Sequence, residues 1–336
     1  MTDEVSAPAL DPESAASWLA FPGNVPDGRP TGLSIETLPR ARTYGPPARE
    51  ALLAGRRFTD KDIDIPAPTG DVTLSVFSPE RFSPGRFSPE QQQQTGAPAV
   101  YWIHGGGMVT GDRFGAGDAL ELAEFIGAVV VSPEYRLAPE HPSPAPVDDC
   151  LAGLLWFADH ARELGVDPTR VILAGGSAGA GLAAATALRI RDEGGPAIAG
   201  LMLLSPMLDD RMTSVSSQQF THGIPWTRLS NEFGWRCLLG DRAGGDDVSI
   251  YEAPGRAEEL AGLPPTFIDV GSADLFRDEA TAFASTLWAC GGNAELHVWP
   301  GGYHGFELMA PTSTLARTAV AARKAWLERL LAVPQQ

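Results

Sequence analysis

A strand, a sharp turn and a helix are encoded by Val171-Ile172-Leu173-Ala174-Gly175-Gly176-Ser177-Ala178-Gly179-Ala180-Gly181. Apolar residues precede a Gly-x-Ser-x-Gly motif, and a segment rich in Ala and Leu follows it. Such a turn brings the backbone close on both sides of the serine, which the small residues Gly175 and Gly179 permit. The alternative is a glycine-rich turn with a helix-capping serine. The strand before and the helix after the motif favour Ser177 as a nucleophile exposed at a helix N-terminus.

A nucleophilic serine needs a base to accept its proton and an acid to orient that base. In this strand-turn-helix context the expected chain order is serine, acid, histidine. His304 lies in a glycine-rich loop beyond the predicted strand Ala294–Trp299, and Asp274 follows the predicted strand Thr266–Val270. Catalytic groups gather at that end of the strands in open α/β sheets. Asp278 is the alternative acid, although its position also suits the first turn of a helix.

A glycine run follows another predicted strand in the sequence His104-Gly105-Gly106-Gly107. No side chain obstructs the backbone N–H groups of these glycines, so they can converge on one point. Together with the N–H of Ala178, beside the nucleophile, they are predicted to form a site for a developing oxyanion. A flexible glycine turn is the alternative, which the position of the run after a strand and before the serine motif disfavours.

The chain from residue 98 onward alternates short apolar segments with amphipathic ones. This pattern predicts a mostly parallel central sheet with helices on both faces, an α/β fold. The predicted strands are Asp62–Pro66, Val72–Ser78, Ala99–Ile103, Ala128–Ser132, Arg170–Ala174, Ile198–Ser205, Thr266–Val270 and Ala294–Trp299. The predicted helices are Pro12–Leu19, Pro46–Leu53, Leu120–Ile126, Pro146–Leu164, Ala178–Asp192, Arg277–Cys290 and Ser313–Leu331. A low-complexity stretch at 79–98 interrupts the pattern and is expected to form a surface loop.

The composition excludes several classes of protein. The 336 residues carry a net charge of −17, which disfavours binding to nucleic acid or to an anionic membrane surface. Cys150, Cys237 and Cys290 are widely spaced and odd in number, so the sequence predicts neither a disulfide framework nor a zinc site. The first residues lack a basic, then apolar, leader pattern, and no apolar run is long enough to span a membrane. These features predict a cytoplasmic protein.

In these motifs the sequence resembles the hormone-sensitive-lipase-like family of α/β-hydrolases, which are mainly carboxylesterases. The matching motifs are His104-Gly-Gly-Gly107, Glu134-Tyr-Arg-Leu-Ala-Pro-Glu-His-Pro142, Gly175-Gly-Ser-Ala-Gly179 and the pair Asp274 and His304. The resemblance implies that Ser177, Asp274 and His304 form the catalytic triad. It also implies that Gly105, Gly106 and Ala178 form the oxyanion hole, with no metal and no cofactor.

The resemblance further implies a cap over the active site. Residues 1–56 would form its N-terminal segment, and an insertion at about 207–255 would complete it within a catalytic domain of 57–336. Tyr135, Met207 and Trp226 are the predicted substrate contacts, and dimers in similar families make a homodimer an expectation. The sequence departs from the usual family motifs at Gly176, where Asp or Thr is common, and at Leu275, where proline is common.

The predicted function is that of a serine carboxylesterase acting on short- to medium-chain esters of small molecules through an acyl-enzyme intermediate. Lactone, carbamate or amide hydrolysis by the same triad is an alternative. A non-catalytic receptor of the same fold is a second alternative, because plant gibberellin receptors resemble this family but lack the histidine. His304 is present here, which favours the enzyme.

Overall fold

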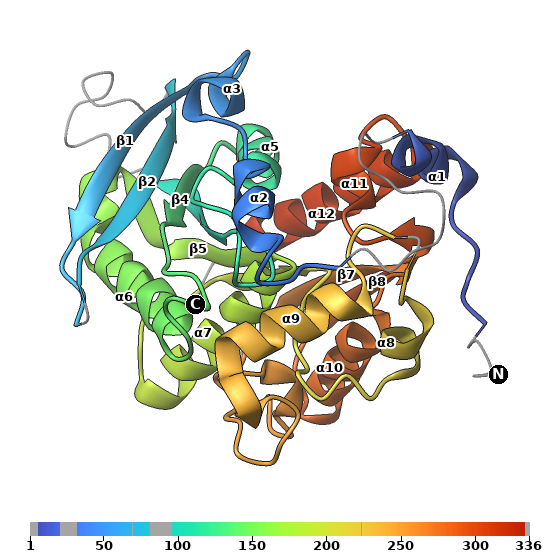
Figure 1. Ribbon diagram of the computed structural model, residues 1–336. Coiled ribbons are helices and arrows are strands. Elements are labelled where there is room, and N and C mark those ends of the chain that lie inside the picture. The colour runs from blue at the N-terminus through green and yellow to red at the C-terminus, as the bar shows by residue number, and fades with distance from the viewer. Residues whose placement is uncertain (1–5, 21–31, 69, 81–95, 223, 333–336) are drawn as a thin grey trace.

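The computed structural model describes residues 6–20, 32–68, 70–80, 96–222 and 224–332. They form one eight-stranded sheet in the order β1-β2-β4-β3-β5-β6-β7-β8 (Figure 1). The strands are β1 (Phe58–Ile65), β2 (Val72–Pro79), β3 (Ala97–Ile103), β4 (Val129–Pro133), β5 (Val166–Gly176), β6 (Gly200–Leu204), β7 (Thr266–Ala273) and β8 (Ala294–Tyr303). Each predicted strand is present, and β5 is longer at both ends than the apolar pattern suggested.

Six strands, β3 to β8, run parallel, whereas β2 is antiparallel to both β1 and β4. The register aligns Tyr101 with Leu173 and Leu173 with Leu201, so the carboxyl ends of β3, β5 and β6 meet at one edge. The prediction of a mostly parallel sheet is therefore confirmed. Most of the low-complexity stretch predicted as a loop, residues 81–95, lies outside the described residues.

Helices cover both faces of the sheet (Figure 1). On one face lie α6 (Ala145–His160), α7 (Ala178–Glu193) and α10 (Arg277–Ala289), and on the other lie α5 (Gly117–Ile126) and α12 (Thr314–Ala332). Side chains of β3 alternate between the two layers: Tyr101 and Ile103 pack with the first group, and Val100 and Trp102 pack with the second. Every residue of β3 is buried, which explains its continuous apolar sequence.

Two segments outside this core supply further helices. The N-terminal segment contains α1 (Pro12–Leu19), α2 (Leu38–Thr43) and α3 (Arg49–Leu53), and the segment between β6 and β7 contains α8 (Val215–Gln219) and α9 (Arg228–Leu239). A short helix, α11 (Phe306–Met309), follows β8, and 3-10 turns span Ala161–Leu164, Gly240–Arg242 and Pro254–Arg256. The predicted helix at α1 has the observed bounds, whereas α2 was not predicted and α3 begins later than expected.

The N-terminal segment is tied to the loops at the carboxyl edge of the sheet. The Asp11 N–H donates to the Gly301 carbonyl over 2.9 Å, next to the strand end of β8. The Leu33 N–H donates to Ser230 Oγ of α9 over 3.1 Å. Arg42 of α2 donates through Nε to the Val109 carbonyl, two residues beyond the glycine run. These contacts bring the two extra segments together above one edge of the sheet.

None of the helices within the described residues is long and apolar enough to cross a lipid bilayer.

Candidate active site

Ser177 occupies the sharp turn between β5 and α7. Its backbone has φ 58°, in the left-handed region that residues with side chains seldom adopt. The flanking glycines are sterically required, because a Cβ at Gly175 would lie 2.3 Å from the Gly179 carbonyl oxygen. A Cβ at Gly179 would lie 2.0 Å from the Ile103 carbonyl oxygen of β3. At Gly176 the nearest atoms would be those of the Trp102 ring at 3.7 Å, so this departure from the family motif does not arise from steric need.

The structure brings Ser177, His304 and Asp274 together from three separate strand ends. His304 Nε2 is 3.0 Å from Ser177 Oγ, and His304 Nδ1 is 2.9 Å from Asp274 Oδ2. Asp274 is completely buried, and its second oxygen accepts a hydrogen bond from the Phe276 N–H over 3.0 Å. The Phe276 ring also meets the His304 ring edge-on, with centroids 5.1 Å apart. The imidazole is therefore held on two sides in the orientation that a base for Ser177 requires.

The electrostatic environment of His304 favours its protonated form. Burial disfavours the imidazolium, but the Asp274 carboxylate and its hydrogen bond outweigh burial and, with Glu307, raise the pKa of His304 above its ordinary value of 6.5. A raised pKa strengthens the imidazole as a proton acceptor.

The alternative acid, Asp278, lies at a different place. Its Oδ2 accepts a hydrogen bond from the Ser216 N–H over 2.7 Å, and its Oδ1 pairs with Arg277. Asp278 thus anchors α8 rather than orienting the histidine. Ser216 Oγ in turn donates to the carbonyl of Leu275, so the residue that departs from the usual proline also takes part in this anchor.

The glycine run after β3 lies directly beside the serine. A Cβ at Gly105 would lie 2.9 Å from the Gly176 carbonyl oxygen and 3.2 Å from Ser177 Cβ, and a Cβ at Gly106 (φ 116°) would lie 2.1 Å from the Thr110 carbonyl oxygen. Both positions therefore exclude larger residues. The Ala178 N–H, at the first position of α7, has no partner within its own helix. Of the predicted oxyanion donors, Gly105 thus lies beside the Ser177 side chain, Gly106 lines the same cavity as Ser177, and Ala178 directly follows Ser177 in the chain.

Two buried aromatic rings support the glycine run from behind. The His104 and Tyr135 rings stack with centroids 4.1 Å apart, and the Tyr135 hydroxyl donates to the His104 carbonyl over 2.9 Å. Burial lowers the pKa of His104 to about 4, so this imidazole is neutral. Its Nδ1 lies 2.8 Å from the Gly105 carbonyl oxygen. The sequence assigned Tyr135 to the substrate pocket, whereas the structure places it under the glycine run that carries the predicted oxyanion donors.

A cavity of about 580 Å³ opens above Ser177 and His304. Its walls come from the glycine run, from α5 and α11, and from the two extra segments, which contribute Tyr44 and Trp226. Trp226 was predicted to contact substrate, and its ring also packs where a Cβ of Gly107 would stand. Met207 was predicted as well, but it is fully buried and does not line the cavity. Its backbone N–H instead donates to the Ser177 carbonyl over 3.1 Å.

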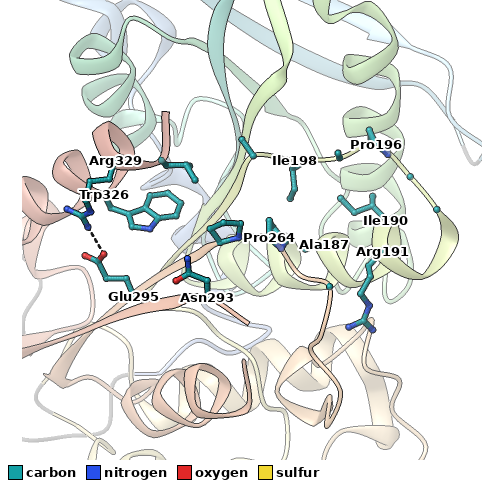
Figure 2. Close-up of a pocket in the computed structure, with 17 residues that line it drawn as sticks. Ala187, Ile190, Arg191, Pro196, Ile198, Pro264, Asn293, Glu295, Trp326 and Arg329 are labelled. Atoms are coloured by element: carbon teal, nitrogen blue, oxygen red, sulfur yellow. Dashed lines mark hydrogen bonds and ion pairs between the residues drawn. The ribbon is translucent and has the colours of Figure 1, made fainter. Parts of the chain in front are cut away.

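A larger cavity, of about 890 Å³, lies at the opposite edge of the sheet. Its lining includes residues 195–199, Pro264, Pro265 and Asn293, which directly precede the parallel strands β6, β7 and β8 (Figure 2). Trp326 and the ion pair between Arg329 and Glu295 form another part of its wall. The described residues around it include no serine, cysteine or histidine.

Sequence reasoning missed two carboxyl groups in the wall of the catalytic cavity, Asp118 and Glu307. Glu307 lies only three residues after His304, and this short distance in the sequence could have indicated that it lies near the site. Asp118 lies at the start of α5, in no motif, and only the fold brings it to the site.

The comparisons with known proteins agree with this architecture. The sequence profile described as alpha/beta hydrolase fold matches residues 100–308, and the chain belongs to that family. The predicted resemblance to its hormone-sensitive-lipase-like branch is confirmed.

Named relatives of the chain are esterases. It is 35% identical to the esterase LipI of Mycobacterium tuberculosis over 76% of this chain and 78% of that protein. It is 37% identical to the carboxylesterase NlhH of the same organism over 70% of this chain and 74% of the relative. A solved structure of a bacterial heroin esterase superimposes with a TM-score of 0.83 at 35% identity, covering 97% of this chain and 99% of the other.

Proposed function

We propose that this protein is a serine carboxylesterase that hydrolyses short- to medium-chain esters of small molecules. The observation that carries the proposal is the hydrogen-bonded series from Ser177 Oγ to His304 Nε2 and from His304 Nδ1 to Asp274 Oδ2. The named esterase relatives support the same reaction class.

The reaction proceeds in two halves. Ser177 Oγ attacks the acyl carbon while His304 Nε2 accepts its proton, and Asp274 stabilises the resulting imidazolium without taking the proton itself. The carbonyl oxygen becomes an oxyanion held by the N–H groups of Gly105, Gly106 and Ala178. His304 then gives its proton to the leaving alcohol. Water, activated by the same imidazole, attacks the acyl-enzyme and releases the carboxylic acid.

The size of the cavity sets the expected substrates. A volume of about 580 Å³ lies within the range of small-molecule sites. Each acyl CH₂ that finds room gains about 0.8 kcal/mol, so rates rise with chain length until the space is filled. A soluble ester of short to medium acyl length therefore fits better than an emulsified long-chain fat.

Residues 1–56 and the insertion at about 207–255 act, in this proposal, as a cap on the catalytic domain of 57–336. The support is that Tyr44 and Trp226 both line the cavity, and that Leu33 bonds to Ser230 across the two segments. Closing the cavity strengthens the oxyanion donors, because hydrogen bonds to a charge are stronger in a low dielectric.

A cytoplasmic location and a homodimer complete the proposal. The three cysteines are free thiols in the structure, as a reducing compartment would keep them. Light scattering during size-exclusion chromatography measures the oligomeric state.

The test of the proposed function is the hydrolysis of p-nitrophenyl butyrate by Ser177→Ala beside Ser205→Ala. Ser205 lines the same cavity but has no hydrogen bond to His304 among the described residues, so Ser205→Ala is the matched control. Loss of Ser177 is expected to reduce kcat by about 10⁴ to 10⁶ with an unchanged melting temperature. Ser205→Ala should cost far less. Retention of the wild-type rate by Ser177→Ala would contradict the proposal.

A further inference from the structure

The ionisable groups in the wall of the catalytic cavity, apart from the histidines and Tyr44, are carboxyl groups within the described residues. Asp118 of α5 and Glu307 of α11 line it, and the described residues around it include no lysine or arginine. Among the histidines of the wall, His104 is neutral, because burial lowers its pKa to about 4. His304 also lines the cavity and is neutral in the active form of the enzyme, so a ligand then meets two carboxyl groups and no lysine or arginine among the described wall residues.

One buried arginine behind the wall does not balance these carboxyl groups. Arg323 donates through Nε to Asp269 Oδ2 over 2.8 Å and through Nη2 to Glu307 Oε1 over 2.7 Å. Glu307 is more than nine-tenths buried, yet its Oε2 has no hydrogen-bond partner among the described residues. Asp118 likewise forms no hydrogen bond or ion pair within the described part of the chain. Three carboxyl groups thus surround one guanidinium.

The remaining neighbours of Asp118 add no free cation. A second cavity of about 230 Å³ also has Asp118 and Glu307 in its wall, and there Lys324 is paired with Glu121 over 2.8 Å. Arg317, on the same wall, bonds to the Thr312 carbonyl and to Thr314. Burial raises the pKa of Asp118 to about 7, Glu307, Glu121 and Asp269 add to the rise, and Arg323 opposes it. A cation in the catalytic cavity would complete the charge balance.

Aromatic rings stand in the same cavity. Tyr44, Trp102, Phe114 and Trp226 contribute to its wall. Arg113 and Arg49 lie over the Phe114 ring at 4.6 Å and 5.3 Å, and Arg40 lies over the Tyr44 ring at 5.7 Å. Trp102 is fully buried, so Trp226 and the second face of Tyr44 are the aromatic surfaces that a ligand would meet. Aromatic faces together with carboxylates are the surroundings that an alkylammonium group prefers. We propose that Asp118 and Glu307 form an acidic subsite of the catalytic cavity that binds an ammonium group of the substrate, so that the protein prefers amine-bearing esters over neutral ones. This inference rests on the proposed function of the same site.

The test compares esters that differ only in charge. Choline butyrate and 3,3-dimethylbutyl butyrate share one shape, with N⁺ in the first replaced by carbon in the second. The p-nitrophenyl esters of 4-(trimethylammonio)butanoate and 5,5-dimethylhexanoate place the same difference on the acyl side. The wild-type protein is expected to favour the charged member in kcat/KM by about tenfold in at least one pair, at neutral pH and low salt.

Variants assign the preference to the subsite. Asp118→Asn is expected to bring the ratio of charged to neutral kcat/KM toward one, and Glu307→Gln should act in the same direction. Glu124→Gln removes the same charge from the same helix outside the catalytic cavity and should leave the ratio unchanged. Raising the pH through the pKa of Asp118 should increase the ratio. The titration of His304 changes kcat/KM for both members of a pair by the same factor, so it cancels in the ratio of charged to neutral kcat/KM.

The outcomes separate this inference from the proposed function. Hydrolysis of the neutral esters with a ratio of one or less in both pairs would overturn the inference alone. The inference alone would also be overturned if Asp118→Asn kept the full wild-type ratio of charged to neutral kcat/KM. This test does not depend on Glu307→Gln, which could fail to fold because Arg323 would lose a partner. Failure to hydrolyse any of the four esters would overturn both.

Discussion

At the scale of single residues, Asp274 and Asp278 lie only four positions apart in the sequence but have different partners. Asp274 is completely buried and bonds His304, whereas Asp278 holds the backbone of Ser216. Asp274→Asn should lower kcat/KM by about 10⁴, because an amide neither stabilises the imidazolium nor favours the required tautomer. Asp278→Asn should cost far less activity and act mainly on the melting temperature through α8. Equal losses of kcat/KM in the two variants would contradict this assignment.

The pH dependence of the reaction belongs to the same scale. In the proposed mechanism His304 accepts the serine proton only when it is neutral, and against the effect of burial Asp274 raises the pKa of His304 above 6.5. Activity should therefore fall as the pH drops through a value above 6.5. The measurement is kcat/KM for a neutral ester across about pH 5 to 9. An acid limb centred well below 6.5 would show that the Asp274 carboxylate does not control this imidazole.

At the scale of elements, the loop after β3 depends on backbone conformations that only glycine supplies easily. Gly106→Ala would place a Cβ 2.1 Å from the Thr110 carbonyl, which must shift and take the neighbouring N–H with it. We expect kcat to fall by about 10² to 10³, the usual cost of an oxyanion donor. Gly117→Ala is the matched control, because this cavity residue has open space around its Cβ position. Comparable losses in both variants would contradict the role of the loop.

The elements themselves were the most predictable part of the molecule. Strands buried on both faces, such as β3, have continuous apolar sequences that predict them. The helix α7 could be predicted because it begins directly after the Ser177 turn and is rich in Ala and Leu. The short helix α2 was missed, because its six residues show no apolar periodicity, although Pro39 stands in its first turn, where proline is favoured. Its stability comes instead from Arg42, whose bonds to distant carbonyls and to Glu140 cannot be seen in a local pattern.

At the scale of the whole molecule, Arg42 connects the N-terminal segment to the site. Its guanidinium bonds the Val109 and Ala138 carbonyls and pairs with Glu140 over 2.8 Å. Arg42→Ala should lower kcat/KM by a few-fold to about 10²-fold through displacement of the cavity wall, with a small change in the melting temperature. Arg40→Ala is the control, because Arg40 lies on the same helix and its side chain bonds only to Tyr44 among the described residues. If Arg42→Ala changes stability alone, the segment serves folding rather than the site.

The wall of the catalytic cavity could be predicted from the sequence only in part. Ser177, Asp274 and His304 could be predicted because each follows a strand in a short motif. Tyr135 and Met207 do not line the cavity, because their positions depend on how buried side chains pack behind the loops, and their contact with substrate stays a prediction. Asp118 and Glu307 meet at one wall because α5 and α11 happen to converge there, which no local pattern records.

The central claim is that Ser177 is the nucleophile of a serine esterase. Its most direct test is intact mass measurement and peptide mapping after treatment with a p-nitrophenyl phosphonate, which forms a stable bond to an activated serine. We predict one adduct per chain, located on Ser177, with loss of activity in parallel and no adduct on Ser177→Ala. An adduct on another residue, or full activity after complete labelling of Ser177, would contradict the claim.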